Sequence, residues 1–300
     1  EVLERERPDI TLVHGDTSTA FVGALSSFYC RVKVAHVEAG LRTNQKYDPF
    51  PEEMNRRLVG CLSDLHFAPT HEHLENLLRE NFLRSNIYVT GNTVVDAVLA
   101  VAAAREGFDD TRIASIDFAG RRLVLVTAHR RENIGEPLRD ICGAVRDVLR
   151  DFPDTVVVMP VHPNPRVRGI VFPELAGVDR CYLIDPVSYP DMVGLMQECF
   201  MVMTDSGGLQ EEAPALGKPV LVLRRTTERP EGLRAGTLKL VGVSREAIRR
   251  EAGILLSNTE KYRQMAESPN PYGDGKASKR VVSGILHHFG LVDGRPADFA

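Results

Sequence analysis

The chain has 300 residues, 43% of them hydrophobic and 26% charged, so it can bury a sizeable core and form about two domains. Its net charge of -4 argues against a nucleic-acid-binding protein, and no apolar run approaches the ~18 residues of a membrane span. The five cysteines lack a C-x-x-C spacing, which indicates neither a zinc site nor a redox pair. We therefore expect a cytoplasmic protein without a metal, a nucleic-acid partner or a membrane anchor.

Short apolar runs alternate with amphipathic runs through the first part of the chain. The apolar runs predict strands at residues 10–14, 34–38, 65–68 and 87–90, and the first of them looks buried. Each is followed by a pattern that predicts a helix, at residues 18–29, 51–62, 70–80 and 93–104. This alternation is typical of βαβ units and a parallel sheet.

A charged, irregular stretch at residues 105–122 interrupts the alternation and indicates a domain boundary. Beyond it the apolar runs predict further strands at residues 123–128, 155–159, 181–184, 200–204 and 219–223. Helices are expected between them, for example at 137–150, where Pro137 suits a first helical turn.

The simplest architecture for this order of elements is an α/β fold of two Rossmann-like domains facing a cleft. We expect the first domain in residues 1–104 and the second in residues 120–270. Residues 271–290 are expected to return towards the first domain.

Carboxylates follow the predicted strands of the first domain, at the sheet edge where ligands bind in such folds. They are Asp16 in HGDTSTA, Glu38 in HVEAGLRT and Glu52 in PFPEE. Crowded, half-buried carboxylates raise one another's pKa and separate into acid and base forms, which suits proton transfer. The alternative is structural, with Asp16 or Thr17 capping a helix and Glu52 and Glu53 stabilising the first turn of another.

A strand, two glycines and a helix start follow one another in TDSGGLQEE of the second domain. Backbone N–H groups near Gly207 and Gly208 can bind a phosphate there, because glycine permits a close approach. Glu211 or Glu212, one turn further on, can accept hydrogen bonds from sugar hydroxyls. The alternative is a simple turn with Ser206 as the helix N-cap.

Cationic side chains follow two other strands of the second domain. In TAHRREN, His129, Arg130 and Arg131 can bind phosphate, or they can form a solvated loop paired with Glu132. In PVHPNP, prolines hold His162 in a rigid loop, and a purely structural role is equally open.

Together these segments resemble those of the non-hydrolysing UDP-N-acetylglucosamine 2-epimerases. Each is weak alone, but together they are highly specific, and they run in order up to about residue 280: VHGDTSTA, HVEAGLRT, PFPEEMNRRL, VTGNTVVDA, TAHRRENIG, PVHPNP, TDSGGLQEEAPALGKPVLVLRRTTERPEG and NPYGDGKAS. The resemblance implies a GT-B-type fold and the reversible epimerisation of UDP-GlcNAc to UDP-ManNAc without a cofactor. It further implies that UDP is eliminated to leave a C1–C2 double bond and is then added back, with protonation on the other face of C2.

The resemblance also implies roles for individual residues. The residues that act at the sugar or the diphosphate are Asp16, Glu38, Glu52 and His129. Those that bind the rest of the substrate are Ser206, Gly207, Gly208, Glu212 and Arg229, and the looser segment DPVSYPDM lies where the uracil binds. A second UDP-GlcNAc is expected as an activator near Arg130 and His162, and the protein is expected to be a homodimer.

One family segment has no counterpart in this chain. Members begin with a strand and a GTRPE-type loop whose arginine helps to hold the nucleotide, whereas this chain begins at Glu1 with EVLERERPD. We therefore expect an incomplete first domain, UDP binding through the second domain, and little epimerisation by the chain alone.

Three other functions remain open from the sequence. A hydrolysing epimerase would release free ManNAc and UDP, and a GT-B glycosyltransferase would share the nucleotide-binding half. A non-catalytic nucleotide-sugar binder would not need Glu38 and Glu52, which are both present.

Overall fold

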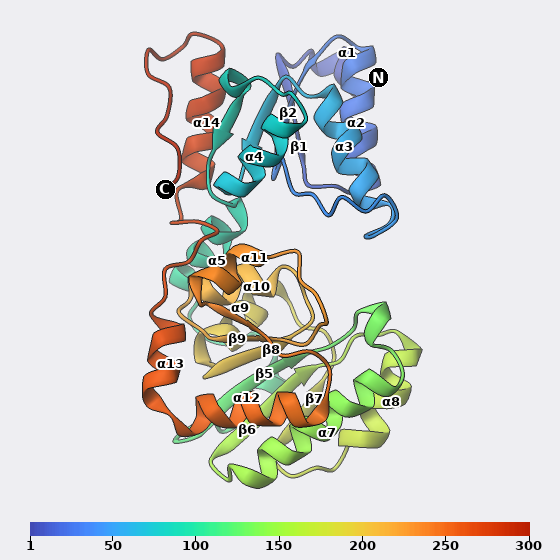
Figure 1. Cartoon of the computed structure of the whole chain (residues 1–300), viewed down its shortest axis with the longest axis vertical. Helices are drawn as coiled ribbons and strands as arrows, with labels where there is room; N and C mark the ends of the chain where they lie inside the picture. The colour runs from blue at the N-terminus through green and yellow to red at the C-terminus, as the bar shows by residue number, and fades with distance from the viewer. The chain divides into compact units, whose positions relative to one another are not determined.

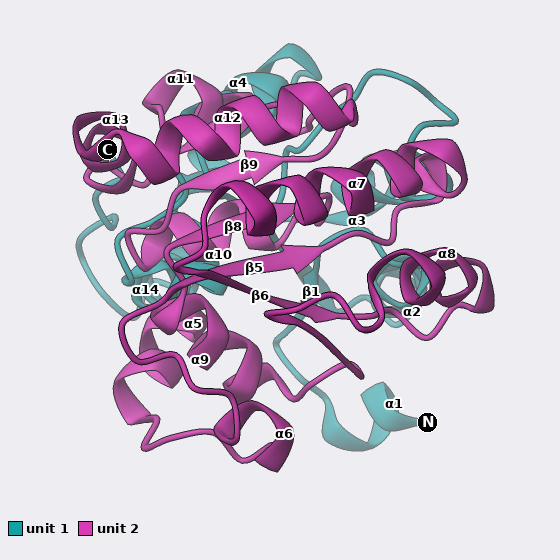
Figure 2. Ribbon diagram, turned by 90° about the horizontal axis from the view of Figure 1, so that it is seen from below, with its two compact units in different colours: residues 1–96, 272–300 teal, residues 97–271 magenta.

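Two parallel sheets form the framework of the computed structural model, which describes residues 1–300. One sheet has four strands and the other has six, and they lie in separate units (Figure 2). Unit 1 comprises Glu1–Asp96 and Tyr272–Ala300, and unit 2 comprises Ala97–Pro271. The α/β fold with two Rossmann-like domains is therefore confirmed, whereas the domain bounds expected from the sequence stay a prediction.

The sheet of unit 1 has the strand order β1-β2-β3-β4, with every neighbouring pair parallel. Its strands are β1 (Ile10–His14), β2 (Lys33–Val37), β3 (Leu65–Ala68) and β4 (Ile87–Val89) (Figure 1). The helices of this unit are α1 (Val2–Glu6), α2 (Ser18–Tyr29), α3 (Glu52–Leu62), α4 (His71–Arg79), the short η1 (Arg84–Asn86) and α14 (Ala277–His288), while α5 (Thr93–Ala104) begins here and continues into unit 2.

Strand β1 is less buried than its apolar sequence predicts. It is an edge strand, so only β2 pairs with it. Only Val13 is buried along its length, and Leu12 is 50% exposed. The expectation of a buried strand at residues 10–14 is therefore wrong, because apolar composition alone does not distinguish an edge strand from a central one.

The sheet of unit 2 has the order β10-β9-β8-β5-β6-β7, also parallel throughout. Its strands are β5 (Arg122–Thr127), β6 (Thr155–Pro160), β7 (Cys181–Ile184), β8 (Met201–Thr204), β9 (Val220–Val222) and β10 (Leu238–Leu240). From β5 the chain adds β6 and β7 on one side, and from β8 it adds β9 and β10 on the other. The strand order thus reverses between β5 and β8, which is where doubly wound sheets bind ligands, beyond the carboxyl ends of the strands.

Helices cover both faces of the unit 2 sheet, because alternate residues of each strand point to opposite sides. Val124 and Val126 pack into the core beneath one layer, whereas Leu123 and Leu125 pack into the core beneath the other. The first layer consists of α7 (Glu136–Asp151), α8 (Pro165–Leu175), α12 (Arg245–Ser257) and α13 (Thr259–Ala266). The second includes α5, α6 (Thr111–Ala114), α9 (Tyr189–Glu198), α10 (Leu209–Ala215) and α11 (Pro230–Ala235).

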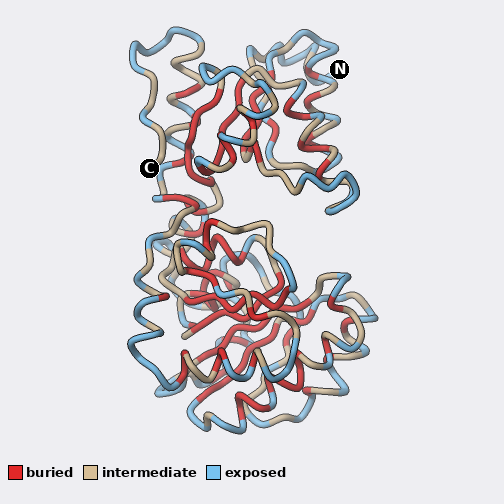
Figure 3. The backbone as a smooth tube through the Cα atoms, in the orientation of Figure 1, coloured by how far each residue is buried: buried red, intermediate tan, exposed pale blue.

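Burial is concentrated in the inner strands of both sheets, as the red segments of Figure 3 show. None of the helices combines the length and the apolar character that a bilayer crossing would require.

Helix α14 closes one face of the unit 1 sheet, and its packing requires a glycine. Val281 and Ile285 of α14 pack against Phe67 and Tyr88. A Cβ atom at Gly284 would lie 2.7 Å from the ring of Phe67, which is fully buried and cannot move aside.

We expect Gly284→Val to lower the free energy of unfolding by roughly 1–3 kcal/mol, the usual result of overpacking. Thermal unfolding followed by circular dichroism measures the change. Gly294→Val is the matched control, since a Cβ at Gly294 would meet no atom within 4 Å. Equal melting temperatures for the two variants would contradict this account of the α14 packing.

Candidate active site

The turn after β1 carries the first of the candidate carboxylates. Thr17, and not Asp16, caps α2, with its side chain accepting the Ala20 N–H at 3.2 Å. Asp16 instead accepts hydrogen bonds from the buried guanidinium of Arg56, including one from Nε at 3.1 Å. The capping alternative therefore does not account for Asp16, whose carboxylate lies half-buried beside a cation.

Glu38 follows β2 and adopts a strained backbone conformation. Its φ is +66°, a value that residues with a side chain rarely adopt and that is enriched at functional sites. Its Oε2 lies 3.4 Å from Nε2 of His14, and its Oε1 accepts a hydrogen bond from Asn92 at 3.2 Å. The hydrogen bond to Glu38 is the main reason why the pKa of His14 is raised, with the Glu38 and Asp16 charges adding to it.

Gly15 makes this arrangement possible for two reasons. Its φ is +70°, and a Cβ at this position would lie 3.1 Å from Oε2 of Glu38. The Gly15 carbonyl also accepts a hydrogen bond from Nε2 of the buried His36 at 2.9 Å. The hydrogen bond from His36 of β2 therefore fixes the turn after β1, and this turn holds His14 and Asp16 close to Glu38.

Glu52 and Glu53 begin α3 but have different environments. Glu52 is half-buried, and its side chain makes no hydrogen bond or ion pair within the protein. It begins the helix whose Asn55 donates to the Asp16 carbonyl at 2.9 Å. The structure thus places Asp16 and Glu38 on the turns that follow two neighbouring strands, and it places Glu52 on the helix that packs against the first of these turns, without joining the Glu52 carboxylate to either.

Glu53 is fully buried and has a structural role that the sequence analysis did not identify. It accepts hydrogen bonds from the backbone N–H groups of Thr43 and Asn44, at 3.0 and 3.2 Å, and pairs with Arg56 and Arg57. Burial alone would raise the pKa of Glu53, but these hydrogen bonds and the Arg56 charge lower it overall. The signal was present in the sequence, because arginines three and four residues after a glutamate share its helix face.

Asp205 organises the site of unit 2, at the point where the strand order reverses. It follows β8 and is completely buried. Its carboxylate accepts the backbone N–H groups of His129 and Arg130, at 2.9 and 2.8 Å, and the side-chain amide of Asn133 at 2.9 Å. The end of β8 is thereby tied to the loop after β5, which includes the short helix η2 (Arg131–Asn133).

Three of the predicted cationic side chains meet beside Asp205. The rings of His129 and His162 stack with centroids 5.3 Å apart, and Arg130 Nε donates to the Asp205 carbonyl at 3.3 Å. Burial is the main cause that lowers the pKa of His129; the Asp205 charge opposes it, while His162 and Arg130 add to it. A bound diphosphate would favour the imidazolium form of His129, which donates hydrogen bonds.

The glycine pair lies next to two guanidinium groups. A Cβ at Gly207 would lie 3.5 Å from Nη2 of Arg130 and 3.9 Å from Nη2 of Arg229. Neither Gly207 nor Gly208 has a positive φ, and no contact below 3.4 Å would exclude a side chain. Because the fold itself does not require glycine here, open backbone beside two cations suits a bound anion.

Ser206 and Glu212 complete this part of unit 2. The N-cap of α10 is Gly208, so Ser206 is not the cap; its N–H donates to the Thr204 hydroxyl at 2.9 Å. Glu212 is buried, and its Oε1 accepts a hydrogen bond from the Tyr189 hydroxyl at 2.8 Å.

Arg229, the N-cap residue of α11, forms an ion pair with Glu211. The predicted uracil region is partly structural, because Val187 and Met192 pack against the core of unit 2.

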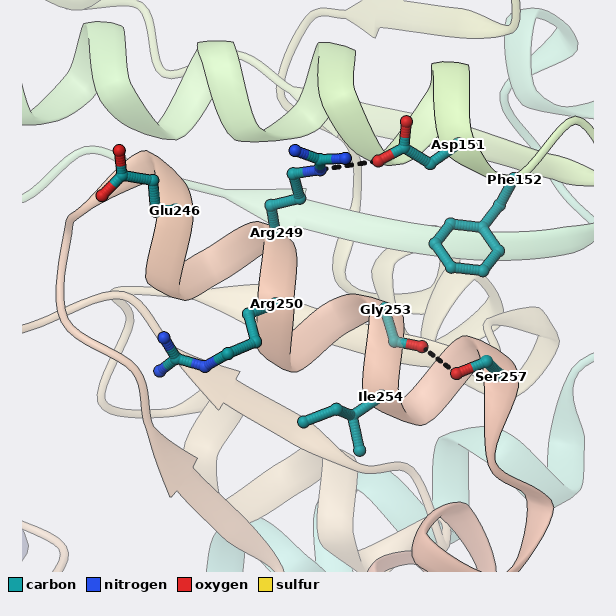
Figure 4. A pocket seen from close by; sticks show the side chains of 8 residues that line it. All are labelled: Asp151, Phe152, Glu246, Arg249, Arg250, Gly253, Ile254 and Ser257. Atoms are coloured by element: carbon teal, nitrogen blue, oxygen red, sulfur yellow. Dashed lines mark hydrogen bonds and ion pairs between the residues drawn. The ribbon is translucent and has the colours of Figure 1, made fainter.

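Two surface hollows of unit 2 lie elsewhere. One, of about 460 Å³, lies between α7 and α12 and contains the Arg249–Asp151 ion pair (Figure 4). Its lining includes Phe152, whose carbonyl accepts the Thr155 N–H where β6 begins, so this hollow is at the amino ends of the strands. The other, of about 480 Å³, is lined by residues of α6, α8 and β7. Neither contains a predicted site residue, and no cluster of three or more His, Cys, Asp or Glu side chains is arranged to hold a metal ion.

Comparisons with known proteins point to one family. A family model described as UDP-N-acetylglucosamine 2-epimerase matches residues 1–286. The UDP-N-acetylglucosamine 2-epimerase of Bacillus subtilis is 48% identical over 300 residues, covering 100% of this chain and 78% of that protein. The S. aureus MnaA–UDP co-structure is 45% identical, with a TM-score of 0.94 over 100% of this chain and 81% of that one. UDP-GlcNAc 2-epimerase from Neisseria meningitidis bound to UDP-GlcNAc is 44% identical, with a TM-score of 0.87 over 95% and 78%.

Two buried histidines beneath the unit 1 site make its stability depend on pH. His36 and His66 are paired on β2 and β3, and burial is the main cause that lowers their pKa values from 6.5 to about 4 and about 3. Below pH 6.5 the unfolded chain therefore binds protons that the folded chain does not. The free energy of unfolding must fall as the pH drops from about 6.5 towards 4.

We expect each histidine to contribute a loss of up to about 1.4 kcal/mol per pH unit across that range. His66→Leu removes one contribution, so its stability should depend less steeply on pH than that of the parent protein. Urea unfolding at a series of pH values measures the two slopes, with the exposed His71→Leu as control. Identical slopes for His66→Leu and the parent would refute the assignment.

Proposed function

The chain belongs to the UDP-N-acetylglucosamine 2-epimerase family, and on that premise we propose that it interconverts UDP-GlcNAc and UDP-ManNAc without hydrolysing them. The observation that carries this proposal is the strained Glu38 after β2, whose carboxylate lies against His14 and next to the turn that carries Asp16. The reaction needs a proton-transfer set and a leaving-group set. Unit 1 supplies the carboxylates for the first, and unit 2 supplies the cations and open backbone for the second.

The proposed chemistry is an elimination followed by the reverse addition. A carboxylate of the set Glu38 and Glu52 removes the proton from C2 while the C1–O bond breaks and its electrons pass to UDP, leaving a double bond between C1 and C2. UDP then adds back to C1 as C2 receives a proton on its other face. Two faces require two proton-transfer groups. Asp16 supports them as a nearby charge, which acts on His14, the partner of Glu38.

UDP departure must be coupled to loss of the C2 proton, because that proton is a weak acid. We propose that the backbone at Ser206, Gly207 and Gly208 binds the diphosphate, together with His129 and Arg229. Positive groups already in place stabilise the charge that develops on the leaving oxygen. Glu212 accepts hydroxyl hydrogen bonds from a sugar of the substrate.

An activator site beside the substrate stays a prediction. Arg130 lies next to Gly207, and His162 stacks on His129, so both belong to the same surface as the proposed diphosphate site. A second UDP-GlcNAc held by them would lie directly beside the first. A homodimer and a cytoplasmic location likewise stay predictions from the sequence.

In a protein that also carries the family's GTRPE-type segment, we expect Glu38→Gln and Glu52→Gln each to lower turnover by about 100-fold or more, the usual scale for a general acid or base. UDP affinity should change little, because neither residue contributes to the proposed diphosphate site. Incubation with UDP-GlcNAc in deuterated water, followed by NMR, measures both C2 exchange and products. The exposed Glu75→Gln on α4 is the control. Near-normal exchange in either variant would remove that residue from the mechanism, and release of free ManNAc would favour the hydrolysing alternative.

We expect Gly208→Val to weaken UDP binding while leaving unit 2 folded. Position 208 is exposed, and a Cβ there would meet only Oε2 of Glu212, at 3.4 Å, so the added bulk would obstruct a ligand but not the fold. Calorimetric titration with UDP and thermal unfolding measure the two effects. Gly169→Val is the matched control, because a Cβ at Gly169 meets nothing within 4 Å. Unchanged UDP affinity in Gly208→Val would place the diphosphate elsewhere.

A further inference from the structure

The two oxygens of the Glu212 carboxylate have different surroundings. Oε1 accepts a hydrogen bond from the hydroxyl of Tyr189, the first residue of α9, at 2.8 Å. Oε2 faces Gly208, since a Cβ there would lie 3.4 Å from it. One oxygen is therefore held by the protein, and the other lies beside the backbone that is proposed to bind the diphosphate.

Tyr189 is itself placed by a set of hydrogen bonds at the start of α9. Ser188 caps the helix, and its side chain accepts the Asp191 N–H and donates to Asp191 Oδ2 at 3.0 Å. The other oxygen of Asp191 accepts the Asp109 N–H at 2.9 Å, and Asp191 is buried. The backbone of Tyr189 is thus fixed, although its own side chain is 41% exposed.

We propose that Tyr189 is a positioning residue that holds Glu212 so that its Oε2 accepts a ribose hydroxyl of UDP. This inference rests on the proposed function, in which unit 2 holds UDP and Glu212 accepts sugar hydroxyls, and what it adds is the positioning role of Tyr189. The ribose is separated from the diphosphate by a single methylene group, so a carboxylate beside Gly208 is within its reach. Tyr189 thereby makes the site select ribonucleotides over their deoxy counterparts.

The carboxylate needs such a partner in order to act as an acceptor. Only 8% of Glu212 is exposed, and this burial raises its pKa, which favours the neutral acid. The Tyr189 hydrogen bond opposes that shift and also restricts the rotation of the side chain. A charged acceptor in a fixed orientation gives stronger and more selective hydrogen bonds than a mobile or neutral one.

A purely structural role for the same hydrogen bond would give a different result. If Tyr189 only joined α9 to α10, losing its hydroxyl would weaken the binding of every nucleotide equally. If Tyr189 acts through Glu212, the loss falls on those ligands that carry the recognised hydroxyl. The ratio of two affinities therefore separates these roles, whereas a single affinity does not.

The experiment is a calorimetric titration of UDP, 2′-deoxy-UDP and 3′-deoxy-UDP into the parent protein, Tyr189→Phe and the control Tyr182→Phe. Tyr182 lies on the edge strand β7, away from Glu212. We expect the parent to bind UDP about 10- to 100-fold more tightly than one of the deoxy forms, as for a hydrogen bond to a charged group. The form that loses affinity identifies the hydroxyl.

Tyr189→Phe should bind UDP about three- to tenfold more weakly and bind that deoxy form almost unchanged, so the selectivity should fall by the same factor. In Glu212→Gln the selectivity should also fall, and adding Tyr189→Phe should lower it no further. Tyr182→Phe should match the parent.

An equal loss of affinity for all three nucleotides in Tyr189→Phe would overturn the inference, as would equal binding of all three by the parent. Absence of UDP binding by the parent is a different result, because it would overturn the proposed function itself. Melting temperatures of the variants establish that each is folded when it is titrated.

Discussion

The buried carboxylate of Asp205 holds together the loops on which the unit 2 site depends. A charge removed from water is costly unless hydrogen bonds replace its hydration. Here the replacement comes from two backbone N–H groups, of His129 and Arg130, and from the amide of Asn133. Asn133 also donates to the Leu223 carbonyl at 3.0 Å, which extends the link to β9. The loop after β5 is therefore shaped from inside the protein, and its cationic side chains remain available to a ligand.

In unit 1, the buried charges near the candidate site are stabilised by ion pairs. Arg56 connects the buried Glu53 with Asp16, while His36 fixes the carbonyl of Gly15. Glu38 then occupies a left-handed conformation that the surrounding contacts must maintain against its intrinsic cost. Both units thus place most of their candidate site residues on loops at the carboxyl ends of the strands and fix those loops with buried polar groups.

Much of this organisation could be predicted from the sequence because it depends on local patterns. The alternation of apolar and amphipathic runs predicted most of the strands to within one residue. Most of the candidate site residues accordingly lie just beyond the carboxyl ends of these strands. Strand β10 escaped detection because the lysine in LKL interrupts the apolar run, whereas the equally short β4 and β9 are apolar throughout. The exposure of Leu12 could not be predicted either, since it depends on strand order, which involves distant pairings.

The details of the sites were harder to predict because they depend on which neighbour satisfies each polar group. The choice of Thr17 over Asp16 as a cap, and of Gly208 over Ser206, is decided by backbone geometry. The family resemblance supplied candidate roles that periodicity alone left open. It did not indicate that Tyr189 and Glu212 form a pair, because their contact joins two helices that are separate in the sequence.

The adjacent glutamates at the start of α3 have a practical consequence. Glu53 supports the loop that contains Thr43 and Asn44, whereas Glu52 supports nothing within the protein. A side chain without structural duties can be neutralised while the surrounding surface keeps its shape. Under the proposed mechanism, Glu52 is therefore the position at which to make an inert form of the protein for crystallographic trapping of an unreacted substrate, and Glu53 is not.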